Sequence, residues 1–151
     1  MTAFALVLLA LWCTALSVID FRVRRLPDPL TLPGALAVLG YAASADRLAA
    51  AVAGALLLAV PYLLVHLAAP AAFGAGDVKL ALGLGAAAAC GGANTWMWAA
   101  LSAPVLTALG GGALTVFRAY RSHAPPANTT VPHGPSMCVG TLAALLAAPF
   151  V

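Results

Sequence analysis

Glutamate is absent from this 151-residue sequence, and charge of either sign is scarce. Seven Lys or Arg and four Asp residues make up 7% of the chain, while 64% of its residues are hydrophobic. Soluble domains carry about a quarter of charged residues, so this shortage excludes an ordinary water-exposed surface. With a mean hydropathy of +1.03, the composition predicts an all-α integral membrane protein. The net charge of +3 rests on too few residues to indicate nucleic-acid binding.

Paired cysteines are also missing. Cys13, Cys90 and Cys138 lie in apolar stretches, and no two of them form a CxxC pair. A disulfide framework and a zinc site are therefore not indicated, and the cysteines are predicted to be small buried hydrophobic residues. A cleavable signal peptide is not evident, because positive charge follows the uncharged stretch Met1–Ile19 instead of preceding it. That order is typical of a first transmembrane helix with its N-terminus outside.

Six apolar segments are predicted along the chain, within a single membrane-embedded domain over residues 1–151. Their ranges are Ala3–Ile19, Thr31–Ala43, Leu48–Ala69, Val78–Gly92, Thr95–Phe117 and Ser136–Val151. A helix needs about 20 apolar residues to span the hydrocarbon, so the second, fourth and sixth segments span only with help from flanking residues or a thinned bilayer. Four full spans with two re-entrant pieces are the alternative. The abundant Ala and Gly predict close helix packing, and Arg118–Gly134 is predicted to be an exposed loop.

The basic residues set the orientation of these segments. The loops after the first, third and fifth segments share one side of the membrane, and that side holds Arg22, Arg24, Arg25, Lys79, Arg118 and Arg121. The other side holds only Arg47. The positive-inside rule then places the first side in the cytoplasm. The prediction is a multi-pass protein of the inner (cytoplasmic) membrane with about six spans and both termini outside.

The four carboxylates have different settings in the sequence. Asp46 lies beside Arg47 in a short external turn, and Asp28 lies in Leu-Pro-Asp-Pro, where an Asp helps to shape a turn before a helix. Asp20 follows a long uncharged run, and Asp77 closes a Gly-x-Gly-Asp turn before the fourth segment. Asp20 and Asp77 are thus predicted at the same cytoplasmic depth. Ionisable groups at membrane depth are costly and indicate function.

Two carboxyls in one site suit the hydrolysis of a peptide bond. An ionised carboxylate takes a proton from the attacking water, and a protonated one donates a hydrogen bond to the scissile carbonyl. Two close carboxyls share one proton, because both cannot ionise cheaply. We expect Gly74 and Gly76 to provide unusual backbone conformations and room for an extended substrate. Lys79 is predicted either to ease the ionisation of Asp77 or to reach the lipid headgroups. A proton-coupled transporter with the same Asp pair is the alternative.

Three stretches together resemble the type IV prepilin peptidases. They are Asp20–Pro33 (DFRVRRLPDPLTLP), Gly74–Leu80 (GAGDVKL) and Val131–Pro135 (VPHGP) followed by Gly140. They occur in the order found in that family and cover nearly the whole chain. The resemblance implies a GxGD-type aspartyl endopeptidase that removes the basic leader of type IV prepilins or pilin-like proteins after a Gly. It implies Asp20 and Asp77 as the catalytic pair, Gly74 and Gly76 as motif-shaping residues, and no metal or organic cofactor.

Two departures from the family pattern refine this expectation. Long family members carry an N-terminal portion with two CxxC pairs that is associated with methyltransferase activity, and these pairs are absent here. The resemblance is therefore to the short, peptidase-only form, whose partners are a pilin-like leader peptide and membrane lipid, with no nucleic acid. His133 stands where the family commonly has an aromatic residue, and His66 is predicted to be a packing residue. The sequence does not say whether the protein forms a homodimer or which secretion system it serves. An inactive role in pilus assembly is a further alternative, but the presence of both Asp residues argues against it.

Overall fold

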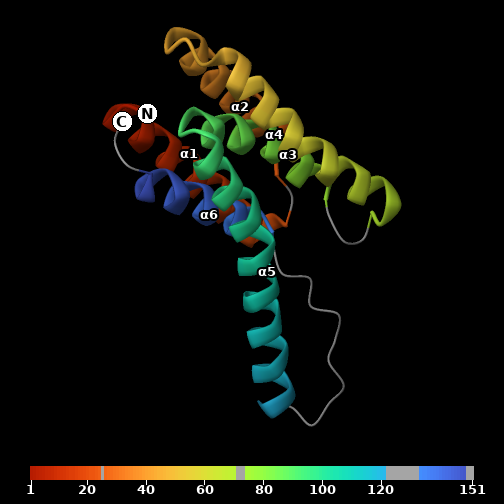
Figure 1. Ribbon diagram of the computed structural model, residues 1–151. Coiled ribbons are helices and arrows are strands. Elements are labelled where there is room, and N and C mark those ends of the chain that lie inside the picture. The colour runs from red at the N-terminus through yellow and green to blue at the C-terminus, as the bar shows by residue number, and fades with distance from the viewer. Residues whose placement is uncertain (25, 71–73, 122–132, 149–151) are drawn as a thin grey trace.

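The computed structural model describes residues 1–24, 26–70, 74–121 and 133–148, and over these residues the chain is helical without strands (Figure 1). The six helices are α1 (Ala3–Val23), α2 (Asp28–Ser44), α3 (Leu48–Ala68), α4 (Ala75–Cys90), α5 (Ala93–Arg121) and α6 (Gly134–Ala147). Each corresponds to one predicted apolar segment. The all-α prediction is confirmed for the described part of the chain.

Most of the helices extend past the apolar segments, because polar residues occupy their terminal turns. α1 continues through Asp20 to Val23 and ends at Arg24, whose left-handed backbone (φ 53°) lets its N–H bond the main-chain oxygen of Asp20. α2 begins at Asp28, after an extended Pro27 at the N-cap. The prediction of a loop over Arg118–Gly134 is wrong at its first residues, since α5 runs to Arg121; residues 122–132 lie outside the described part.

α4 forms the centre of the helix bundle. It packs against α2, α3, α5 and α6, and every residue from Leu80 to Cys90 except Leu82 is buried. Small residues make this packing close: a Cβ added at Gly85 would lie 2.5 Å from the main-chain oxygen of Gly54 on α3. Backbones that approach this closely gain dispersion contacts where a hydrophobic driving force is absent. The predicted role of small residues in tight packing is confirmed at Gly54, Gly83 and Gly85, whereas nothing lies within 4 Å of a Cβ added at Gly110 or Gly112. The three cysteines are buried as predicted.

The outside of the bundle is apolar, as expected for a protein surrounded by lipid. Large hydrophobic side chains such as Phe4, Leu11, Leu57 and Leu101 are exposed. Within the described residues, three helices are long and apolar enough to cross a membrane, namely α1, α3 and the Ala93–Phe117 part of α5. α2, α4 and α6 have 17, 16 and 14 residues. The structure therefore supports a membrane protein, while six full spans and external termini remain predictions.

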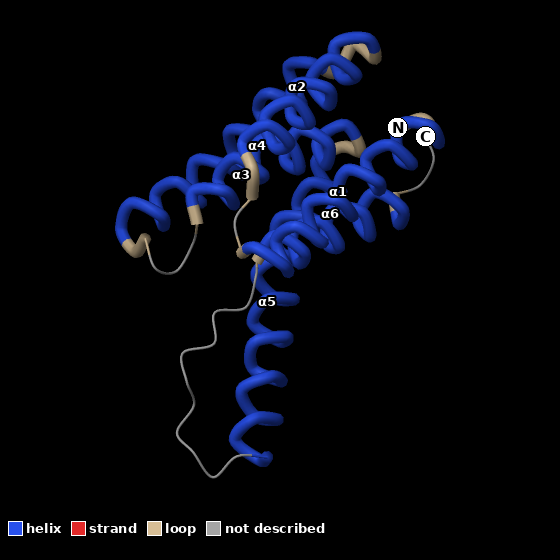
Figure 2. The backbone as a smooth tube through the Cα atoms, turned by 180° about the vertical axis from the view of Figure 1, so that it is seen from behind, coloured by secondary structure: helices blue, strands red, loops and turns tan. Residues whose placement is uncertain are grey.

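The helices alternate in direction, which sorts their ends into two groups. The start of α1 and the end of α6 lie together at one end of the bundle (Figures 1 and 2). The end of α1 and the start of α6 lie together at the other end, where Gly134 approaches Asp20. The second half of α5 projects away from the other helices (Figure 2). This arrangement brings distant sequence motifs to one end of the molecule.

Candidate active site

Three stretches that are far apart in the sequence meet around Leu26, just after α1. A Cβ added at Gly76 on α4 would lie 2.9 Å from the Cβ of Leu26. A Cβ added at Gly134, the first residue of α6, would lie 3.7 Å from Cδ1 of the same leucine. Leu26 is 9% exposed and thus fills the space between the starts of α4 and α6. The end of α1 and the starts of α4 and α6 are thereby held together.

Asp20 lies in the last turn of α1 and is buried by this arrangement. Its exposed fraction is 7%, and its Oδ2 atom has no hydrogen-bond partner among the described residues. A Cβ added at Gly134 would lie only 2.8 Å from that oxygen, so the absence of a side chain at position 134 makes room for the carboxyl. A buried carboxyl oxygen without a partner is costly, so the burial of Asp20 needs a reason other than stability.

Asp77 lies in the first turn of α4 and is partly buried. Its Oδ2 accepts a hydrogen bond from the N–H of Gly74 at 3.0 Å, and its own N–H donates to the Gly74 oxygen at 3.1 Å. An acidic side chain that bonds back to the N-cap N–H stabilises a helix start. The Asp77 carboxyl is also close enough to Asp20 for the two charges to interact. The two aspartates predicted from the sequence therefore lie at the same end of the bundle, within electrostatic reach of each other.

The two glycines of the Gly-x-Gly-Asp motif act differently from the expectation. Gly74 is the N-cap with φ −74°, and among the described glycines only Gly92 has a positive φ. The predicted unusual backbone conformation at Gly74 and Gly76 is therefore wrong. Gly76 is needed for space, because Leu26 occupies the position of a side chain there. The space at Gly76 is thus filled by the protein itself, whereas a Cβ added at Gly74 would meet only Asp77 and Gly76, at 3.5 Å or more.

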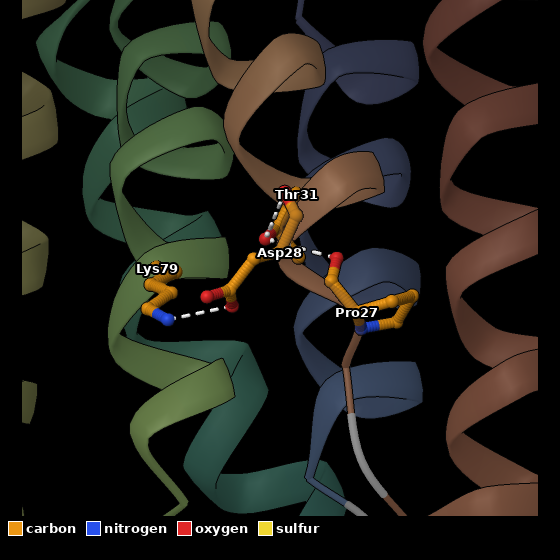
Figure 3. A network of polar contacts seen from close by, with 4 residues as sticks. All are labelled: Pro27, Asp28, Thr31 and Lys79. Atoms are coloured by element: carbon orange, nitrogen blue, oxygen red, sulfur yellow. Dashed lines mark hydrogen bonds and ion pairs between the residues drawn. The ribbon is translucent and has the colours of Figure 1, made fainter.

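Lys79 forms an ion pair with Asp28 that the sequence analysis did not anticipate. Its Nζ donates to Oδ1 of Asp28 at 2.6 Å, and Figure 3 shows the lysine reaching from α4 to the first residue of α2. The hydroxyl of Thr31 bonds the main-chain oxygen of Pro27 at 3.3 Å in the same helix turn. Asp28 is the first residue of α2, as expected for a residue at a helix start, but no side chain caps that start; the Asp28 carboxylate instead links α2 to α4.

A second polar group near the Asp pair comes from α3, α5 and the residue before α6. The Oη of Tyr62 lies 2.8 Å from Nε2 of His133, and Oγ1 of Thr107 lies 2.6 Å from Nδ1. Tyr62 and His66, one turn apart on α3, are both within electrostatic reach of Asp77. Neither Tyr62 nor Thr107 was predicted from the sequence as part of the site. Polar residues four apart in an apolar helix, as Tyr62 and His66 are, were the available signal.

Comparison with known proteins gives one match. The model of the type IV leader peptidase family matches residues 7–150 of the chain. This range includes Asp20, Gly74–Asp77 and His133–Gly134. No curated protein and no solved structure matches the chain.

Proposed function

The chain belongs to the type IV leader peptidase family, and we propose that it is an aspartyl endopeptidase with Asp20 and Asp77 as its catalytic pair. Family membership makes the chain a protease. The proposed substrates are type IV prepilins or pilin-like proteins, cut after a Gly that ends a basic leader. The observation that carries the aspartyl mechanism is that a buried Asp20, which has an unsatisfied oxygen, lies within electrostatic reach of Asp77 on another helix end. Neither the structure nor the comparisons give any support to the transporter alternative.

The proposed mechanism uses the two carboxyls as a unit. One carboxylate removes a proton from water as the water attacks the carbonyl carbon of the Gly, while the protonated carboxyl donates to the carbonyl oxygen. The gem-diol forms when the protonated carboxyl passes its proton to the carbonyl oxygen, and the pair keeps the proton taken from water. When the C–N bond breaks, the leaving amine takes up a proton from the pair and one gem-diol hydroxyl returns a proton to it. One proton is shared throughout, so the titration belongs to the pair and not to either residue. The bond from Gly74 N–H to Asp77 holds one carboxyl in place during these transfers.

The position of the site relative to the membrane is part of the proposal. Arg22 and Arg24 lie at the same end of the bundle as Asp20, and Arg47 lies at the other end, where its guanidinium donates to the Cys90 oxygen at 2.9 Å. The excess of basic residues beside the Asp pair supports a cytoplasmic site in the inner membrane. Reporter fusions at Asp46 and Asn94 should report the outside, and a fusion at His123 the cytoplasm. A reversed pattern would contradict this orientation.

Asparagine variants test the catalytic pair directly. Asp20→Asn and Asp77→Asn keep the size of each side chain but remove its acid–base function, so each should lower the cleavage rate by roughly 10³-fold or more. The assay is cleavage, by the full chain in membranes, of a synthetic peptide with a Lys-rich leader ending in Gly before an apolar stretch of about 20 residues.

Asp46→Asn is the matched control for these variants. Asp46 lies in the turn at the opposite end of the bundle and has a left-handed backbone (φ 55°), which Asn also adopts readily. This variant should insert and cleave like the unmodified protein. Normal cleavage by Asp77→Asn would eliminate the proposed mechanism.

A further inference from the structure

His133 is the residue immediately before α6, and its side chain is held on both sides. It is 7% exposed, with Nε2 bonded to Tyr62 of α3 and Nδ1 bonded to Thr107 of α5. The His133 and Tyr62 rings also lie against each other, with their centroids 5.4 Å apart. The side chain gives no cap to the start of α6. Its bonds are directed sideways, to two helices that are distant in sequence.

We assign the direction of these hydrogen bonds from the neighbouring acceptor of Thr107. Oγ1 of Thr107 lies 3.0 Å from the main-chain oxygen of Ala103, which only accepts, so the single hydroxyl proton is donated there. Thr107 therefore accepts from Nδ1–H of His133. In a neutral imidazole the other nitrogen is then an acceptor, and the Tyr62 hydroxyl donates to it. Burial lowers the pKa of His133 to about 4, which agrees with a neutral ring.

We propose that His133 is a positioning residue, which ties the start of α6 to α3 and α5 and so keeps Gly134 against the Asp20 carboxyl. His133 and Gly134 are joined by one peptide bond, and a Cβ at position 134 would be 2.8 Å from Oδ2 of Asp20. A shift of the imidazole therefore moves Gly134, whose backbone packs against the Asp20 carboxyl. Tyr62, His133 and Thr107 together are called the clamp below. Tyr62, at one end of this clamp, lies within electrostatic reach of Asp77. The clamp thus connects the surroundings of both carboxyls. This inference rests on the proposed function.

Kinetics of two conservative variants test this role. Tyr62→Phe keeps the ring and removes only the hydroxyl, and His133→Phe keeps a planar ring and removes both nitrogens. Because a small misplacement of a catalytic group is expensive, each should lower kcat for the leader peptide roughly 10- to 100-fold. KM should stay unchanged, since the ground-state contacts of the substrate are not altered. The double variant should be no slower than His133→Phe, because the two residues act as one unit.

Tyr41→Phe is the matched control. It also removes one hydroxyl that is bonded, here to the N–H of Thr2 at 3.0 Å, but at the opposite end of the bundle. Its kcat should equal that of the unmodified protein. A histidine that only fills the core would give losses in stability with kcat unchanged, and that result for both Tyr62→Phe and His133→Phe would overturn the inference. Loss of cleavage in Asp20→Asn alongside it would leave the proposed function standing.

Two measurements test the clamp without depending on cleavage. The ¹⁵N chemical shifts of His133 in the detergent-solubilised protein at neutral pH should show the Nδ1–H tautomer, and Thr107→Val should alter them. The effects of Tyr62→Phe and His133→Phe on the unfolding temperature should be non-additive. An Nε2–H tautomer or additive effects would overturn the inference, whether or not the peptide is cleaved. Absence of cleavage by the unmodified protein would instead overturn the proposed function and the catalytic role of the clamp with it.

Discussion

Replacement of Gly134 by Ala places one methyl group against the carboxyl of Asp20, one of the two proposed catalytic residues. The new Cβ would lie 2.8 Å from Oδ2 of Asp20, whereas a carbon and an oxygen normally approach no closer than about 3.3 Å. The start of α6 is fixed by His133, so Asp20 must give way by about half an ångström. A misplacement of 1 Å costs up to about 100-fold in rate. Half of that free energy is about 1.4 kcal/mol, which corresponds to a tenfold loss of kcat.

The assay for this prediction is steady-state cleavage of the leader peptide by the solubilised full chain. KM should remain near its original value, because the methyl group faces the carboxyl and not the substrate. Gly112→Ala is the control: nothing lies within 4 Å of a Cβ added there, and Ala should stabilise that helix by about 0.5–1 kcal/mol. Unchanged kcat in Gly134→Ala would refute the close approach of α6 to Asp20. Equal losses in both variants would refute a local steric cause.

Two other predictions concern charge. Asp28→Asn breaks the ion pair with Lys79, but both side chains are substantially exposed. The free energy of unfolding should therefore fall by at most about 1 kcal/mol, and cleavage should be retained. A loss of cleavage like that of Asp77→Asn would contradict this prediction. Burial lowers the pKa of His133 to about 4, from an ordinary value of about 6.5, so at this residue the unfolded chain binds an extra proton between these pH values. The contribution of His133 to stability should therefore fall as the pH falls from 6.5 to 4. His133→Phe, which leaves the carboxyl of Asp20 beyond Gly134 and the neutral Tyr62 and Thr107 in place, should remove this contribution, so the unfolding temperature of the variant should gain relative to that of the unmodified protein as the pH is lowered; an identical pH dependence of the two proteins would contradict it.

The helices could be predicted from the sequence because lipid exposure leaves a strong apolar signal in each one. Their ends could not, since Asp20 and Asp28 are polar and yet lie inside helical turns. The pairing of Asp20 with Asp77 was predictable because alternating helix directions place their loops on one side. The side-chain contacts depend on how the helices pack. Lys79 and Asp28 are 51 residues apart, and nothing in either local sequence points to the other.

The role of the glycines could not be predicted from the sequence either. Gly74 and Gly76 stood out in the sequence, but their pattern suggested backbone freedom, whereas the structure uses Gly76 for close packing against Leu26. Leu26 itself is an ordinary leucine in the sequence. His133 was noticed only as a departure from the family pattern. Its bonds to α3 and α5 could not be inferred without knowing which helices surround it.

The shared contacts of Leu26 impose an evolutionary constraint. One side chain is fitted against glycines at positions 76 and 134, which belong to different motifs 58 residues apart. A larger residue at position 76 is compatible with the fold only if position 26 becomes smaller. A larger residue at position 134 reaches Leu26 only beyond its first contact, with Asp20, so substitutions at positions 26, 76 and 134 should be epistatic. In homologous sequences they should therefore change together or not at all. The motifs that contain Gly76 and Gly134 are separate in the sequence, but because both contact Leu26 they should evolve together.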